Sequence, residues 1–176
     1  MRIIREEAAA VVIDYQEKLV PAMHKKEELI RNSQILLKGL KILGVPMCVT
    51  QQYTKGLGMT VSEIQEAAGT KAYMDKISFS TADVIAEQVQ GKKYVILCGM
   101  EAHICVLQTL IDLKAKGYVP VLVEDCISSR KKNDKKMAIE RAIQEGAIVT
   151  TYEAVLFELL KEAGTEESKA IQRLIK

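Results

Sequence analysis

Tryptophan is absent from this sequence, and aromatic residues make up only 5% of it. A surface that binds nucleic acid by stacking needs several exposed aromatic side chains, so this composition argues against one. Charge of one sign is not in excess either, because 25 basic and 23 acidic residues are interspersed and leave a net charge of +2. We therefore expect no nucleic acid partner.

Long apolar runs and cysteines spaced as metal ligands are also missing. No segment approaches the ~20 apolar residues that cross a bilayer. The first apolar run is interrupted by Arg5, Glu6 and Glu7, which is unlike a signal peptide. The four cysteines stand in or beside apolar runs: Cys48, Cys98, Cys105 and Cys126. We expect reduced thiols in a cytoplasmic protein without a membrane partner.

Short apolar runs alternate with segments of helical periodicity, and we expect residues 1–176 to form a single domain. The expected strands are Ala8–Ile13, Val45–Val49, Ala72–Ile77, Tyr94–Cys98, Val119–Val123 and Ala147–Thr150. The expected helices are Lys25–Leu43, Val61–Ala68, Thr81–Gln90, a helix from near Cys105 to Gly117, Asp134–Glu145, Tyr152–Ala163 and Glu166–Ile175. This alternation predicts an α/β fold with a parallel sheet and helices on both faces.

Polar residues follow several of these strands at their carboxyl ends. Ligands of such sheets bind at that edge, near the point where the strand order reverses. Asp14 follows the first strand, Lys76 lies at the end of the third, and Cys105 follows the fourth. Two polar loops, Thr50–Gly58 and Ser128–Asn133, are expected at the same edge. The sequence therefore predicts that a carboxylate, an ammonium group and a thiol meet there.

These three groups suit nucleophilic catalysis. Cys105 is expected at the first turn of a helix, where free N–H groups and the helix dipole favour a thiolate. Asp14 can accept its proton if burial raises the pKa of the carboxyl, while Lys76 holds the charges in place. Each residue alone also has an ordinary interpretation, as a packing cysteine, a capping carboxylate or a solvated lysine.

Three motifs around these residues resemble those of the isochorismatase-like cysteine hydrolase family: VVIDYQEKL, KISFS and GMEAHICVLQTLIDL. In that resemblance Asp14, Lys76 and Cys105 correspond to the catalytic aspartate, lysine and nucleophile. The segments VTQQYTKGLG, EDCISSRKKND and TTYEAVLFELL also resemble one subgroup, whose members are mostly hydrolases of undefined substrate. The similarity extends over nearly the whole chain, and three motifs in this order are more specific than any one residue.

The resemblance implies a three-layer, doubly wound sheet of six parallel strands in the order 3-2-1-4-5-6, a small-molecule substrate and a homo-oligomer. It also implies a cis peptide bond between Met100 and Glu101, and an oxyanion hole formed by the backbone N–H groups of Glu101 and Cys105. The candidates for the walls of the substrate pocket are Gln16, Gln51, Tyr53, Met100 and His103.

The chain also departs from parts of the family. Nicotinamidase members carry an aspartate and two histidines after the second strand as metal ligands, whereas this chain has Gln51, Gln52 and Tyr53 there. Its only histidines are His24 and His103, so we expect neither a metal ion nor another cofactor. Near a helix N-terminus His103 is expected to be neutral, as a wall or interface residue, with a catalytic base as the alternative.

The cysteine bears on the reaction class. Isochorismatases usually lack this nucleophile, so Cys105 favours a metal-independent hydrolase that forms a covalent intermediate with a small amide, carbamoyl or ester substrate. Two alternatives stay open: a hydrolase of the isochorismatase type that cleaves a vinyl ether without covalent chemistry, and a non-catalytic interaction module. The loop that contains Ser128, Ser129, Arg130, Lys131 and Lys132 either binds a substrate carboxylate or is solvated.

Overall fold

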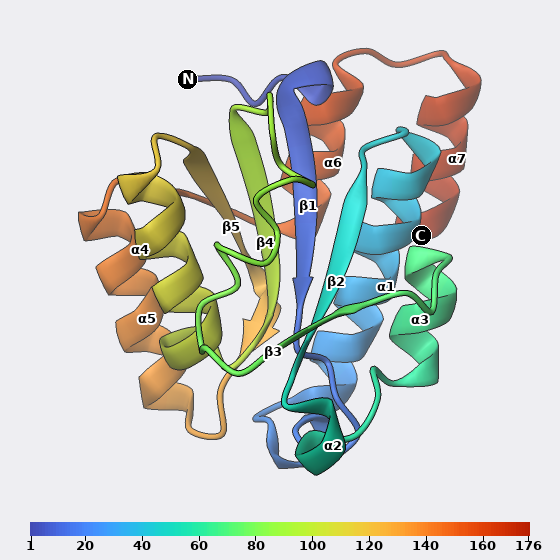
Figure 1. Cartoon of the computed structure of the whole chain (residues 1–176). Coiled ribbons are helices and arrows are strands. Elements are labelled where there is room, and N and C mark those ends of the chain that lie inside the picture. Colours follow the sequence, from blue (N-terminus) through green and yellow to red (C-terminus); the bar gives the residue numbers. More distant parts are fainter.

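A computed structural model of residues 1–176 shows a six-stranded parallel sheet with helices on both faces (Figure 1). The strands are β1 (Ala8–Ile13), β2 (Met47–Gln52), β3 (Met74–Lys76), β4 (Tyr94–Met100), β5 (Val119–Ser128) and β6 (Ile148–Thr150). Their order in the sheet is β3-β2-β1-β4-β5-β6, and every neighbouring pair is parallel. The expected fold class and strand order are therefore confirmed.

Seven α-helices connect and cover the strands. They are α1 (Lys26–Ile42), α2 (Thr54–Leu57), α3 (Ser62–Ala68), α4 (Leu107–Ala115), α5 (Lys132–Gln144), α6 (Tyr152–Leu160) and α7 (Glu166–Ile175). Figure 1 shows α4 and α5 on one face of the sheet, and α1, α3, α6 and α7 on the other. No helix is long and apolar enough to span a membrane.

The central strand β1 shows why the strands read as continuous apolar runs. All six of its residues are buried, because helices cover both faces of the sheet. Successive side chains of a strand point to opposite faces, so alternate residues enter two different cores. Ala8, Ala10 and Val12 join the core on the α1 side, and Ala9, Val11 and Ile13 join the core on the α4 side.

Two strands run further than predicted, through polar residues. β2 continues to Gln52, because its last three residues pair with β3 and their backbone N–H and C=O groups can form hydrogen bonds there. β5 continues to Ser128 through Glu124 and Asp125. A shift of its register against β4, between Leu97 and Gly99, lets the two strands pair again after these polar residues.

The predicted helix Thr81–Gln90 is instead a series of irregular turns. Its apolar spacing is correct, because Ala82, Ile85 and Val89 are buried on the α4 side of the sheet. The backbone N–H groups, however, donate hydrogen bonds in part to the carbonyl three residues earlier and in part to the carbonyl four residues earlier, so no regular helix forms. Just before this segment, the Ser80 hydroxyl accepts a hydrogen bond from the Ala82 N–H at 3.3 Å. Apolar periodicity thus predicts the buried face but not the hydrogen-bond pattern.

Candidate active site

The three candidate catalytic residues lie at the carboxyl edge of the sheet, where the strand order reverses between β1 and β4. Asp14 directly follows β1 in a left-handed backbone conformation with φ of 56°, which ends the strand. Lys76 is the last residue of β3, and Cys105 lies in a π-helical turn, Ala102–Val106, between β4 and α4. Close approach of β4 to β1 requires Gly99, where a Cβ would lie 2.0 Å from the Ile13 carbonyl oxygen.

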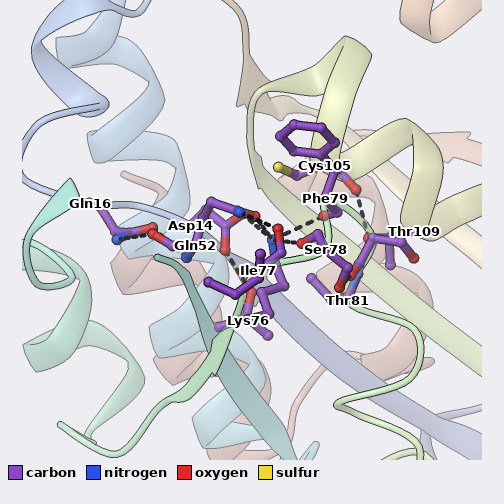
Figure 2. Close-up of polar contacts among 12 residues, drawn as sticks. Asp14, Gln16, Gln52, Lys76, Ile77, Ser78, Phe79, Thr81, Cys105 and Thr109 are labelled. Atoms are coloured by element: carbon purple, nitrogen blue, oxygen red, sulfur yellow. Dashed lines mark hydrogen bonds and ion pairs between the residues drawn. The ribbon is translucent and has the colours of Figure 1, made fainter. Parts of the chain in front are cut away.

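Asp14 and Lys76 form a buried ion pair (Figure 2). The Lys76 Nζ lies 2.8 Å from Asp14 Oδ2, and neither side chain is exposed to solvent. The other carboxylate oxygen of Asp14 accepts a hydrogen bond from the Thr50 hydroxyl at 2.9 Å. Burial raises the pKa of the Asp14 carboxyl above its ordinary value, although Lys76 and Thr50 act in the opposite direction. A carboxylate with a raised pKa is a better proton acceptor.

The Lys76 ammonium group is held by four oxygen acceptors. Besides Asp14, it donates to Gln52 Oε1 at 2.7 Å and to the carbonyls of Ser78 and Phe79 at 3.2 and 2.9 Å (Figure 2). Gln52 is therefore part of the site, which the sequence did not reveal. The signal that would have revealed it is the register of β2, because Gln52 pairs with Lys76 across the sheet.

Asp14, Lys76 and the backbone N–H of Glu101 all act on the pKa of the Cys105 thiol. Only 6% of Cys105 is exposed, and burial is the largest cause that raises the pKa of its thiol to about 12. The negative charge of Asp14 raises it further, while Lys76 and the Glu101 N–H lower it. The expectation that the helix end favours a thiolate at Cys105 is therefore wrong, because desolvation outweighs the helix end.

Glu101 directs its backbone and its side chain to different partners. Its peptide bond with Met100 is cis, as the resemblance implied. The backbone N–H lowers the pKa of the Cys105 thiol, while both carboxylate oxygens lie 3.1 Å from Arg130 Nε. One of these oxygens also accepts the Arg130 backbone N–H at 3.1 Å. The Glu101 carboxylate is thus paired with Arg130.

Three of the five pocket candidates are buried and engaged elsewhere. Gln16 bonds both backbone groups of Gln52 and the Gly58 carbonyl. Gln51 is likewise bonded to Thr54 and Thr60 in the same loop. Met100 is fully buried in the core on the α1 side. These three residues therefore do not line an opening in this structure, because their side chains are occupied by packing and hydrogen bonds.

The other two candidates, Tyr53 and His103, remain accessible. Tyr53 is 50% exposed. His103 Nδ1 lies 2.9 Å from the Ser129 hydroxyl, and its Nε2 lies 3.8 Å from an Asp134 carboxylate oxygen. This places His103 between the end of β5 and the start of α5.

Apolar side chains border the catalytic residues, and the larger grooves lie elsewhere. Ile77 and Phe79, on either side of Ser78, are 71% and 54% exposed. A groove of about 500 Å³ lies near α1 and α5, is lined mainly by charged side chains and contains none of the three catalytic candidates. The candidate site formed by Asp14, Lys76 and Cys105 therefore lies outside this groove. No group of three or more His, Cys, Asp or Glu side chains is arranged to hold a metal ion.

Comparison with known sequences identifies relatives over the whole fold. The family model of the isochorismatase domain matches residues 8–154, which include all six strands. The secreted isochorismatase effector Isc1 of Phytophthora sojae is 38% identical over 184 residues, which cover 99% of this chain and 87% of that protein. Isochorismatase domain-containing protein 1 of Danio rerio is 38% identical over 93% of this chain. This chain spans 59% of that relative's length.

Solved structures share the architecture. MAR1 ribonuclease from Caenorhabditis elegans is 36% identical, with a TM-score of 0.94 over 99% of this chain and 92% of that one. The YcaC gene product of Escherichia coli, described as an octameric hydrolase of unknown specificity, has a TM-score of 0.85 over 92% of this chain and 83% of that one. At 22% identity this second likeness concerns the fold alone. By its family model and its relatives, the chain belongs to the isochorismatase family.

Proposed function

We propose that this chain is a cysteine hydrolase that cleaves an amide, carbamoyl or ester bond of a small molecule without a metal ion or other cofactor. One observation carries the proposal: the buried Asp14 carboxylate is paired with the Lys76 ammonium group, and both charges act on the pKa of the Cys105 thiol. A base beside a thiol, held in place by a third group, is the arrangement that nucleophilic catalysis needs.

The reaction begins with a protonated thiol, because the pKa of Cys105 is about 12. Asp14 takes the proton as the sulfur attacks the carbonyl carbon, and the electron pair of the C=O bond moves to its oxygen. Backbone N–H groups of Glu101 and Cys105 stabilise this oxyanion. When the intermediate collapses, the C–N or C–O bond breaks and Asp14 returns the proton to the leaving group. Water then hydrolyses the thioester and regenerates the thiol.

Lys76 supports this cycle through charge and position. Its four oxygen contacts fix the ammonium group, which keeps the Asp14 carboxylate oriented toward the thiol. The positive charge also lowers the pKa of the Cys105 thiol and so assists proton transfer. Asp14, Lys76 and Cys105 therefore act as one unit in this proposal.

Three rival functions predict different outcomes. A vinyl-ether hydrolase of the isochorismatase type needs acid assistance but no attack by Cys105. A non-catalytic interaction module of the same fold would bind small molecules without turnover. The name of the Caenorhabditis elegans relative adds a ribonuclease as the third. Cleavage of RNA by this chain would replace our proposal of a small-molecule substrate.

We also propose a homo-oligomer in the cytoplasm, with residues 1–176 as a single domain. Exposed apolar side chains beside the site, Ile77 and Phe79, support association, and the Escherichia coli relative is described as octameric. Four free, buried cysteines support a reducing compartment. The Phytophthora sojae relative is named as a secreted protein, so expression with fractionation is the appropriate test of location.

The decisive experiment is a turnover assay combined with intact-mass detection of an acyl adduct. Small amides, carbamoyl compounds, esters, isochorismate and an RNA oligonucleotide form the panel. We expect turnover of an acyl compound, an adduct on Cys105, and loss of both in Cys105→Ala. Cys48→Ala, which removes another buried thiol, serves as the matched control and retains activity.

Two results would reject the covalent proposal. The first is turnover that survives in Cys105→Ala, which would support the non-covalent route. The second is the absence of turnover with every acyl compound in the panel, which would favour RNA cleavage or the interaction module.

A further inference from the structure

A buried threonine on α4 joins the two halves of the site. Thr109 lies one helical turn after Cys105, and its hydroxyl donates to the Cys105 carbonyl oxygen at 2.6 Å. The Thr109 hydroxyl oxygen in turn accepts the backbone N–H of Thr81 at 2.9 Å, as Figure 2 shows. The Thr81 hydroxyl lies 3.3 Å from it. No part of the proposed reaction uses Thr109.

The two partners of Thr109 lead to opposite sides of the reaction centre. Cys105 carries the nucleophile. Thr81 ends the short segment in which the carbonyls of Ser78 and Phe79 accept hydrogen bonds from Lys76. Apart from the bonds to Thr109, no hydrogen bond joins residues 77–81 to residues 101–109. The Thr109 hydroxyl is therefore the direct polar link between the lysine segment and the nucleophile turn.

A hydroxyl group is required for this link. It supplies one hydrogen for the Cys105 carbonyl and lone pairs for the Thr81 N–H, so a single atom satisfies two backbone groups. Both threonines are fully buried, and no water reaches their side chains to replace a lost partner. A valine has the same shape but serves neither backbone group, and buried polar groups without partners are costly.

We infer that Thr109 is a positioning residue for the proposed cysteine hydrolase, and that its hydroxyl holds the Cys105 turn in register with the Lys76 segment. This inference rests on the proposed function. Thr109 touches no reacting atom and acts through the backbone of Cys105 and Thr81. The hydroxyl therefore affects the rate of the chemical step and not the affinity for substrate.

The expected effect is a selective loss of rate. A displacement of about 1 Å at a reacting group costs roughly 10²-fold, so we expect Thr109→Val to lower kcat by about 10- to 100-fold. KM stays within about twofold, because no substrate contact is removed. Alkylation of Cys105 by iodoacetamide slows together with kcat. Thr109→Ser keeps the hydroxyl and retains most of both rates.

The experiment compares two pairs of proteins, and in each pair one protein carries the hydroxyl and the other lacks it. The pairs are the wild type with Thr109→Val, and Thr109→Ser with Thr109→Ala. For each protein, kcat and KM on the best acyl substrate, the Cys105 alkylation rate by peptide mapping, and Tm are measured. Ser168→Ala is the matched control. It also removes a buried hydroxyl, which lies on α7 and donates to the Thr165 carbonyl at 2.8 Å. It changes Tm but not kcat.

The inference is supported if both proteins without the hydroxyl lose kcat and alkylation rate while both proteins with it keep them. Equal rates within either pair overturn it, and so does failure of both hydroxyl-free variants to fold, which assigns Thr109 a structural role. Activity retained in Cys105→Ala rejects the proposed function itself. Loss of activity in Cys105→Ala with a normal Thr109→Val rejects this inference alone.

Discussion

Replacing Asp14 with asparagine removes the group that accepts the Cys105 proton and keeps the shape of the side chain. General-base catalysis contributes roughly 10²- to 10⁴-fold, which corresponds to about 3 to 5 kcal/mol in the activation barrier. We expect the larger loss here. With the pKa of Cys105 at about 12, only about one thiol in 10⁵ is ionised at pH 7 unless a base removes the proton.

The same substitution leaves the Lys76 ammonium group buried without a negative partner. Breaking a buried ion pair in this way costs roughly 3 to 5 kcal/mol of folding stability. Three other oxygens, from Gln52, Ser78 and Phe79, remain within 3.2 Å of Lys76 Nζ. We therefore expect a cost at the low end of that range, a lower Tm and an intact fold.

The assay measures kcat, Tm and the Cys105 acyl adduct for Asp14→Asn. The exposed Asp112 on α4 provides the matched control, because Asp112→Asn makes the same chemical change outside the site and leaves kcat unchanged. Adding Lys76→Met to Asp14→Asn should cost little more activity, since residues that act as a unit are not additive. Activity within twofold of the wild type in folded Asp14→Asn would refute the assignment of Asp14 as the base.

Three further predictions concern metals, pH and thiols. Turnover should survive exhaustive chelation, and a loss that zinc or iron restores would contradict a metal-independent reaction. Asp14 must be ionised to accept a proton and burial raises its pKa, so kcat/KM should fall on the acid side at a pH above the ordinary ~3.9 of an aspartate, as a pH–rate profile measures. Limiting iodoacetamide should modify Cys105 before the other thiols and inactivate in step, because Lys76 lowers the pKa of the Cys105 thiol and Asp14 can accept its proton. Peptide mapping that finds Cys48 or Cys126 labelled first, with activity retained, would rule against this order.

The apolar runs of the sequence predicted the positions of the strands better than their ends, and the strand order came from the family resemblance. Apolar runs located the six strands, because buried strands of a parallel sheet must be apolar on both faces. The last residues of β2 and β5 are polar, however, and they are held in the sheet by pairing with neighbouring strands. Such pairing depends on residues distant in the sequence, so neither the extension of β2 to Gln52 nor that of β5 to Ser128 follows from a local pattern.

The site shows the same division. Asp14, Lys76 and Cys105 were identifiable because motifs place each of them at a strand end or in the turn after a strand. Gln52 and Thr109 were not, since their roles depend on contacts made only in the folded chain. The thiolate expected at Cys105 was wrong for a related reason. A helix end is visible in the sequence, whereas the desolvation that dominates the pKa of this thiol comes from packing around the turn.

The burial of the catalytic groups also bears on the size of the substrate. The Asp14 and Lys76 side chains are not exposed to solvent and Cys105 is only 6% exposed, so we expect a substrate to present a small reacting group to the sulfur. Ile77 and Phe79, which flank Ser78 in the segment after Lys76, are exposed apolar side chains. A small acyl group displaces few of these contacts, whereas an RNA strand brings charged phosphates onto apolar side chains and must lose their hydration. Under the proposed function we therefore expect a small, weakly polar acyl compound, and not a nucleic acid, to react with Cys105.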